Sequence, residues 1–263
     1  MNTDLDYNIK KPADITSETK VIIMLHGYGS NKEDLFSFSD YMDPKALIIS
    51  VQAPHKMDYG SYCWWALNFD ESMNLSIEVS QARESINQLH KFISEYLVNN
   101  YNFSLNNIFL LGFSQGAMAA YTLSINYPDF YKKVIGLSGK IPYEIINYNK
   151  ENDYSFHNYF CSHGIFDQVI PIDIGRDSSS WFTNKKIKHV FLEFQSQHGV
   201  SPENFEDSGY QVPQTMEALK SLTEKMVKDG KTPLMVCSTA GTTVLGAFDP
   251  IISTFTSPLF TIL

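Results

Sequence analysis

Short apolar runs alternate with longer segments of helical periodicity between residues 21 and 194. The runs are rich in β-branched residues and have the length of buried strands; they cover 21–25, 47–51, 108–111, 134–137, 159–161 and 190–194. Apolar residues recur at spacings of three and four in 82–97, and 115–126 and 175–184 also have helical patterns. This alternation predicts an α/β fold with a mostly parallel central sheet and helices on both faces. In such a fold, functional groups are expected at the carboxyl ends of the strands.

The alternation stops near residue 207. Residues 213–229 have one amphipathic pattern, closed by Gly230, whose apolar stripe consists of Met216, Leu219, Leu222 and Met226. We therefore divide the chain into an α/β domain, residues 1–207, and an atypical tail, residues 208–263. We expect the tail helix to cover an apolar flank of the domain. The alternative is that the tail comes from a recombined reading frame.

Composition and charge narrow the class of protein. The chain has 263 residues, of which 43% are apolar, so it can bury a full core. Its net charge of −9 is spread without long runs, which argues against nucleic acid as a partner. The cysteines Cys63, Cys161 and Cys237 are odd in number and far apart, which predicts reduced thiols. Without a signal peptide or an apolar span, we expect a cytoplasmic monomer or homodimer with no stable membrane insertion.

The pentapeptide Gly112-Phe113-Ser114-Gln115-Gly116 lies between the strand 108–111 and the helix 115–126. A serine on such a tight turn from strand to helix has a strained backbone and an exposed hydroxyl, and glycines on either side avoid collisions with the crossing backbone. We therefore predict that Ser114 is a nucleophile.

A serine hydroxyl needs a base, and the base needs an orienting acid. Asp167 follows the strand 159–161, and His198 follows the strand 190–194. The order Ser, Asp, His along the chain is that of α/β-hydrolases. We take Asp167 as the acid and His198 as the base.

Other residues compete for the roles of acid and base. Asp173 is a nearby competitor for Asp167, and an aspartate can also simply cap a turn. A lone loop histidine such as His198 can be a surface residue. His26 and His163 are each followed by glycine, so we assign them structural roles.

Acyl transfer also requires donors for the developing oxyanion. We assign this role to the backbone N–H groups of Gln115, directly after the nucleophile, and of Tyr28, in the glycine-containing loop 26–31. That loop could alternatively be a phosphate-binding turn, but it lacks the GxGxxG and Walker patterns. For an apolar acyl group we assign Trp64 and Trp65, in the aromatic stretch 59–67, together with Val169; core packing is the alternative for the aromatic residues.

Four motifs together resemble the carboxylesterase, phospholipase and acyl-protein thioesterase family of α/β-hydrolases, over about residues 7–207. They are Leu25-His26-Gly27-Tyr28-Gly29, Gly112-Phe113-Ser114-Gln115-Gly116, His163-Gly164-Ile165-Phe166-Asp167-Gln168-Val169-Ile170-Pro171 and His198-Gly199-Val200-Ser201-Pro202-Glu203-Asn204. The resemblance implies a triad of Ser114, Asp167 and His198, and an oxyanion hole at Tyr28 and Gln115. It also implies a small-molecule ester or thioester substrate and no cofactor or metal.

The tail resembles a different class of protein. Residues 209–251 are similar to an internal piece of the glutamate-type (group II) pyridoxal-phosphate decarboxylases, in which the aspartate at the position of Asp249 pairs with the cofactor. The chain ends at Leu263, before the position of the Schiff-base lysine, so we expect no bound cofactor. Two alternatives to an esterase are a non-catalytic hydrolase-like binding protein and a relic of a decarboxylase.

Overall fold

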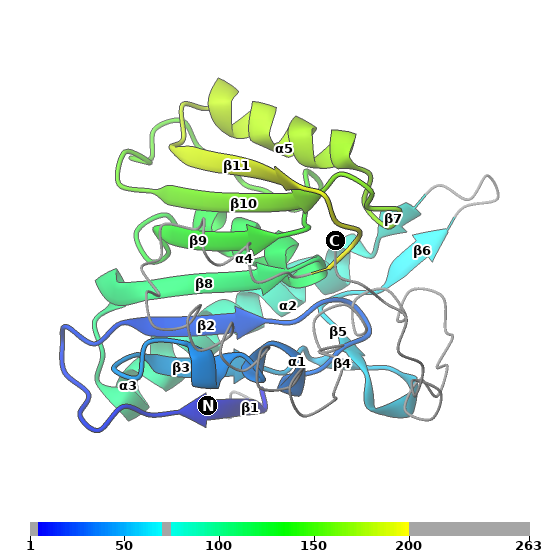
Figure 1. Ribbon diagram of the computed structural model, residues 1–263. Coiled ribbons are helices and arrows are strands. Elements are labelled where there is room, and N and C mark those ends of the chain that lie inside the picture. Colours follow the sequence, from blue (N-terminus) through cyan, green and yellow to red (C-terminus); the bar gives the residue numbers. More distant parts are fainter. Residues whose placement is uncertain (1–4, 70–74, 200–263) are drawn as a thin grey trace, which may run out of the picture.

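A seven-stranded sheet forms the centre of the fold (Figure 1). The computed structural model describes residues 5–69 and 75–199. The strands are β1 Tyr7–Lys10, β2 Val21–Leu25, β3 Leu47–Val51, β8 Ile108–Phe113, β9 Lys133–Leu137, β10 Asn158–Gly164 and β11 His189–Phe194. They follow the order β1-β3-β2-β8-β9-β10-β11, in which β1 is antiparallel to β3 and the other neighbours are parallel. The expected mostly parallel sheet is confirmed.

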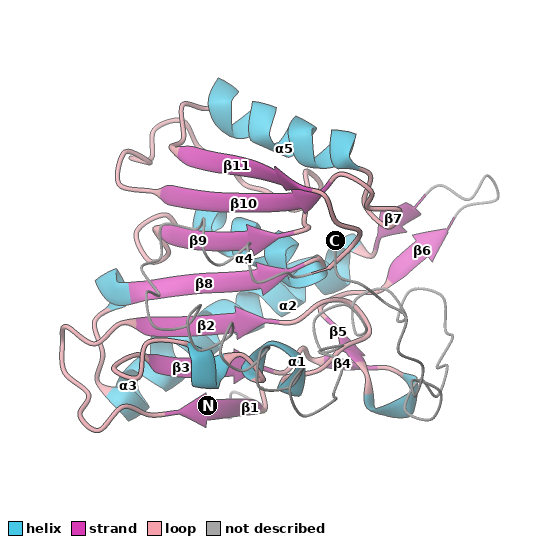
Figure 2. Cartoon of the chain, viewed as in Figure 1, coloured by secondary structure: helices cyan, strands magenta, loops and turns pink. Residues whose placement is uncertain are grey.

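Helices cover both faces of this sheet (Figure 2). They are α1 Glu33–Phe36, α2 Val79–Lys91, α3 Val98–Tyr101, α4 Gln115–Asn126 and α5 Ile172–Asn184, and a π-helical turn, Phe92–Leu97, joins α2 to α3. Short 3₁₀ turns cover Ser39–Tyr41, Asp58–Gly60 and Leu105–Asn107. Helix α4 contacts β2, β8 and β9, whereas α1 contacts β2 and β3. The helices expected over 82–97, 115–126 and 175–184 are therefore present.

Strand β2 shows why these strands have continuous apolar sequences. Its alternate residues Val21, Ile23 and Leu25 join a large core cluster that includes residues of α2 and α4. Ile22 and Met24 join a second cluster with Leu35 of α1. Because a parallel strand with helices on both faces buries every side chain, its sequence does not alternate between apolar and polar residues.

The parallel strands end at one edge of the sheet, toward which their arrowheads point in Figure 1. The loops that follow β2, β8, β10 and β11 all begin at this edge. Residues far apart in the sequence can therefore meet there.

The sequence pattern missed several short strands. They are β1 and the two hairpins formed by β4 His55–Lys56 with β5 Tyr62–Cys63 and by β6 Leu67–Phe69 with β7 Leu75–Ile77. Strand β1 is half-buried throughout, so it has no apolar run that would reveal it. Strand β10 is also longer than expected, because it includes His163 and Gly164. The predicted tail helix and the boundary at residue 207 lie outside the described residues.

Candidate active site

Ser114 lies between the end of β8 and the start of α4, in a strained backbone conformation. Its φ of 54° and ψ of −117° are unusual for a residue with a side chain. The turn is possible because both flanking positions are glycine. A Cβ on Gly112 would lie 2.3 Å from the carbonyl oxygen of Gly116, and one on Gly116 would lie 1.9 Å from that of Leu25. Any larger residue would therefore push α4 away from β2 and β8.

The imidazole of His198 connects Ser114 to Asp167. Its Nε2 lies 3.0 Å from the Ser114 Oγ, and its Nδ1 lies 2.6 Å from the Asp167 Oδ2. The three residues come from the loops after β8, β10 and β11, and each is at most 8% exposed. Asp173, the other candidate acid, is exposed on α5 and bonds Arg176 at 3.0 Å.

Asp167 is a buried carboxylate held by several donors. Its Oδ1 accepts the backbone N–H groups of Val169 and Ile170, each at 2.8 Å. Burial alone would raise the pKa of Asp167, but hydrogen bonds from His163 and His198 outweigh it and hold that pKa well below its usual range. The ionised carboxylate accepts the Nδ1–H of His198, which leaves Nε2 free to accept the hydroxyl proton of Ser114.

His163 is a second histidine beside this acid, which the sequence pattern placed in a purely structural role. Its Nε2 lies 2.7 Å from the carbonyl oxygen of Ile170 and 3.3 Å from the Asp167 Oδ2. Since a carbonyl oxygen can only accept, Nε2 carries the proton. The local signal for this contact with Asp167 is weak: His163 is the last residue but one of β10 and precedes Asp167 by four positions.

The loop that contains Tyr28 and the first turn of α4 both lie beside Ser114. A Cβ built on Gly27 would lie 3.5 Å from the Cβ of Ser114, so the loop after β2 passes directly beside the serine. Gln115 is the first residue of α4, where backbone N–H groups have no partner inside the helix. Among the described residues, neither the Tyr28 N–H nor the Gln115 N–H donates to a protein acceptor. Both amides therefore have no partner in the described ranges, as an oxyanion donor requires.

The expected acyl-binding residues lie in two different environments. Trp64 and Trp65 are fully buried in the large core cluster, so the structure does not support a place for them at a substrate surface. They belong to the same cluster as residues of the sheet, α2 and α4, which is the core-packing alternative. Val169 is half-buried in the loop after β10, next to Asp167.

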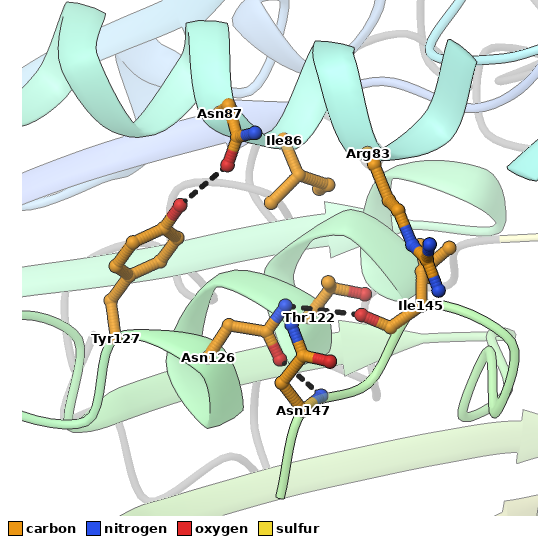
Figure 3. Close-up of a pocket in the computed structure, with 8 residues that line it drawn as sticks. All are labelled: Arg83, Ile86, Asn87, Thr122, Asn126, Tyr127, Ile145 and Asn147. Carbon is orange, nitrogen blue, oxygen red and sulfur yellow. Dashed lines mark hydrogen bonds between the residues drawn. The ribbon is translucent and has the colours of Figure 1, made fainter. Parts of the chain in front are cut away.

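A hollow of about 190 Å³ lies between α2 and the second half of α4 (Figure 3). Asn126 bonds Ile145 and Asn147 there, and the Tyr127 hydroxyl bonds Asn87. Asn126 is the last residue of α4, and Gln115 is the first. At 1.5 Å per residue, the two ends of this helix are roughly 16 Å apart. The hollow is therefore separate from the serine site.

Within 5–69 and 75–199, no group of three or more His, Cys, Asp or Glu side chains has an arrangement that could hold a metal ion. No helix in the same ranges is long and apolar enough to cross a membrane.

The sequence matches the model of the phospholipase/carboxylesterase family over residues 8–240. The chain belongs to the phospholipase/carboxylesterase family. It is an ester-hydrolysing enzyme with an α/β-hydrolase fold. The match extends beyond residue 207, the end of the resemblance that the four motifs indicate.

Two acyl-protein thioesterases and one solved carboxylesterase structure are similar to this phospholipase/carboxylesterase family protein. The chain is 26% identical to acyl-protein thioesterase 1 of Candida albicans over 234 residues, which cover 82% of this chain and 98% of the relative. It is 24% identical to acyl-protein thioesterase 1 of Kluyveromyces lactis over 196 residues, covering 69% and 83%. A carboxylesterase structure from Bacillus cereus superposes with a TM-score of 0.67 at 18% identity, covering 81% of this chain and 96% of that one.

Short stretches of this family member match proteins of other classes. A stretch of 32 residues is 69% identical to the alpha-glucosides-binding periplasmic protein AglE of Rhizobium meliloti, and the chain spans 7% of that protein's length. A stretch of 75 residues is 35% identical to the acidic amino acid decarboxylase GADL1 of Bos taurus, of which it covers 14%. The similarity to decarboxylases is therefore confined to a small piece of that protein.

Proposed function

We propose that this enzyme cleaves carboxylic esters or thioesters with short to medium acyl chains through a covalent acyl-enzyme. The Ser114 Oγ attacks the substrate carbonyl carbon while the His198 Nε2 takes the hydroxyl proton. Asp167 orients the imidazole and stabilises the imidazolium, and the N–H groups of Tyr28 and Gln115 bind the oxyanion. The observation that supports this best is the bonding of one imidazole to both partners, at 3.0 Å to Ser114 and 2.6 Å to Asp167.

The remaining steps release both products and restore the enzyme. The tetrahedral intermediate collapses, the bond from carbon to the leaving oxygen or sulfur breaks, and His198 gives its proton to the leaving group. Water attacks the acyl-enzyme while His198 again acts as base. A second collapse releases the carboxylic acid and restores the Ser114 hydroxyl.

The leaving group and the acyl length are two further parts of the proposal. The names of the two acyl-protein thioesterase relatives favour thioester cleavage as a second candidate. Half-buried Val169 remains our candidate for contact with the acyl chain. With p-nitrophenyl acetate, butyrate, octanoate and palmitate, we expect kcat/KM to be highest for butyrate or octanoate. A maximum at palmitate would contradict the proposed acyl length.

We also propose a cytoplasmic monomer or homodimer. Cys63 and Cys161 are free and buried, which is compatible with a reducing compartment. Fractionation of the source cells and size-exclusion chromatography with light scattering test the two statements. Recovery outside the cytoplasm, or a larger assembly, would contradict them.

Labelling with a fluorophosphonate probe tests the nucleophile. Wild-type protein should be labelled, and Ser114→Ala should lose both labelling and turnover, the latter by about 10⁴- to 10⁶-fold. Ser50→Ala is the matched control, because Ser50 is also buried but lies within β3. It should be labelled like the wild type. Labelling of folded Ser114→Ala would overturn the assignment of the nucleophile.

A further inference from the structure

His26 is a fully buried histidine directly after β2, and its hydrogen bonds determine which ring nitrogen carries the proton. Its Nε2 lies 3.1 Å from the backbone nitrogen of Ala53 and 3.1 Å from the side-chain nitrogen of Gln52. A backbone N–H can only donate, so Nε2 must accept. Burial lowers the pKa of His26 to about 4, so the ring is neutral at pH 7. Its one proton is therefore on Nδ1.

The Nδ1–H of His26 donates to the carbonyl oxygen of Gly27, at 2.8 Å. That carbonyl belongs to the same peptide unit as the N–H of Tyr28. Every peptide bond of the described residues is trans, and in a trans peptide the C=O and N–H point in opposite directions. By holding the oxygen on one side, His26 therefore sets the direction of the Tyr28 N–H on the other. The Ser30 N–H, 3.3 Å from the same oxygen, adds a second restraint.

A second set of buried hydrogen bonds ties this loop to the start of α4. The indole Nε1 of Trp64 donates to the carbonyl oxygen of His26 at 2.9 Å. The side chain of Gln115 holds the backbone of Trp64 and Trp65: its Oε1 accepts the Trp64 N–H at 2.9 Å, and its Nε2 donates to the Trp65 carbonyl at 2.8 Å. The two amides on either side of Ser114 are thus connected through residues that are at most 2% exposed.

We propose that His26 is a positioning residue for ester hydrolysis, which orients the Gly27–Tyr28 peptide so that the Tyr28 N–H points at the oxyanion. Trp64 and the Gln115 side chain hold this peptide at a fixed distance from the Gln115 N–H. The inference rests on the proposed roles of Tyr28 and Gln115 as donors. Charge develops on the substrate oxygen only as the carbonyl carbon becomes tetrahedral, so a donor held in advance stabilises the transition state more than the bound substrate.

The roles of the two ring nitrogens of His26 can be tested separately, because asparagine and glutamine place their amides at different positions. In His26→Asn, the amide nitrogen can take the place of Nδ1 and still donate to the Gly27 oxygen. In His26→Gln, the longer side chain carries its amide toward the place of Nε2, and the bond to Gly27 is lost. A merely structural role would not favour asparagine, which is the smaller residue and leaves the larger cavity.

The experiment measures kcat and KM for p-nitrophenyl butyrate and Ki for a trifluoromethyl ketone with the same acyl chain. Addition of a serine to this ketone creates an oxyanion, so Ki reports the donors directly. We expect His26→Gln to lower kcat and to weaken Ki by a common factor of roughly 10 to 100, with KM within about 3-fold of the wild type. His26→Asn should remain within about 5-fold of the wild type in both.

His157→Asn is the matched control, because His157 is also fully buried but precedes β10, at the opposite edge of the sheet from Ser114. It should lower the Tm and leave kcat and Ki unchanged. If His26→Gln does not fold, Trp64→Phe replaces it, since it removes the bond to the His26 carbonyl. It should change kcat and Ki by one common factor of about 3 to 10.

Three results would overturn the positioning role: equal losses in His26→Asn and His26→Gln, a rise in KM alone, or a fall in kcat with no change in Ki. These are distinguishable from failure of the proposed function. If Ser114→Ala keeps full turnover, the proposed function fails. If Ser114→Ala is inactive and His26→Gln has wild-type kcat and Ki, the positioning role alone fails.

Discussion

The two sides of Ser114 are held by different kinds of interaction. On the side of the proposed acid and base, His198 is held by a charged group, the Asp167 carboxylate, between loops that follow β10 and β11. On the side of the proposed oxyanion donors, here called the oxyanion side, the loop after β2 is held by neutral groups, namely the imidazole of His26 and the indole of Trp64. Orientation of the His198 imidazole therefore depends on the ionisation of Asp167, whereas orientation of the loop after β2 depends on buried neutral groups.

This difference predicts different sensitivity to substitution and to pH. Replacing a charged partner changes the protonation of its neighbour and so affects the reaction directly. Replacing a neutral buried partner leaves polar groups without hydrogen bonds and so affects stability as well. Three predictions test this contrast, beginning with the largest effect.

Asp167→Asn should lower kcat by about 10⁴-fold with the fold retained. An asparagine amide donates to the Nδ1 of His198, which moves the ring proton to Nε2, and Nε2 can then no longer accept the proton of Ser114. Steady-state kinetics together with circular dichroism provide the measurement.

Asp173→Asn is its matched control. Asp173 is an exposed partner of Arg176, and an exposed ion pair contributes little, so kcat should stay within about 2-fold of the wild type. Equal losses in the two variants would show that the base does not depend on Asp167.

Gln115→Met should lower the free energy of unfolding by about 2–4 kcal/mol, because the Trp64 N–H and the Trp65 carbonyl lose their buried partners. Urea denaturation measures the change. Gln168→Met, at an exposed position, should change the same free energy by less than about 0.5 kcal/mol. A similar small change in both variants would mean that the Gln115 side chain does not hold the oxyanion side.

The pH dependence of stability should separate the two sides. The pKa of His26 is lowered by burial from 6.5 to about 4, so between these pH values the unfolded chain binds a proton that the folded chain does not. His26 therefore makes the free energy of unfolding fall, by up to about 3 kcal/mol, as the pH decreases from about 6.5 to about 4. The pKa of Asp167 is held low, so its contribution is present above pH about 4 and is lost below that value.

Urea denaturation at a series of pH values tests these two pH ranges. His26→Asn should flatten the decrease between pH about 6.5 and about 4, and Asp167→Asn should flatten the decrease below about 4. Curves for both variants that run parallel to the wild type would contradict the assignment of these two buried groups.

Residues with local signals were predictable from the sequence. The strand runs and the turn around Ser114 follow from periodicity and from the steric need for glycine at 112 and 116, which the structure shows as distances too short for any Cβ. The half-buried β1 lacked such a signal. Trp64 was misplaced because an aromatic residue in a connection has the same local pattern whether it faces substrate or core, and it is fully buried.

The sequence by itself determined the fold class and the family. Strand and helix periodicity are local patterns, and the order of the motifs can be read directly along the chain. Only the tertiary structure decided which nitrogen of His26 carries the proton, since that depends on the Ala53 N–H, 27 positions away. It also decided that Trp64 connects His26 to Gln115. Hydrogen-bond geometry between distant segments depends on packing within a fraction of an ångström, and no local sequence pattern records it.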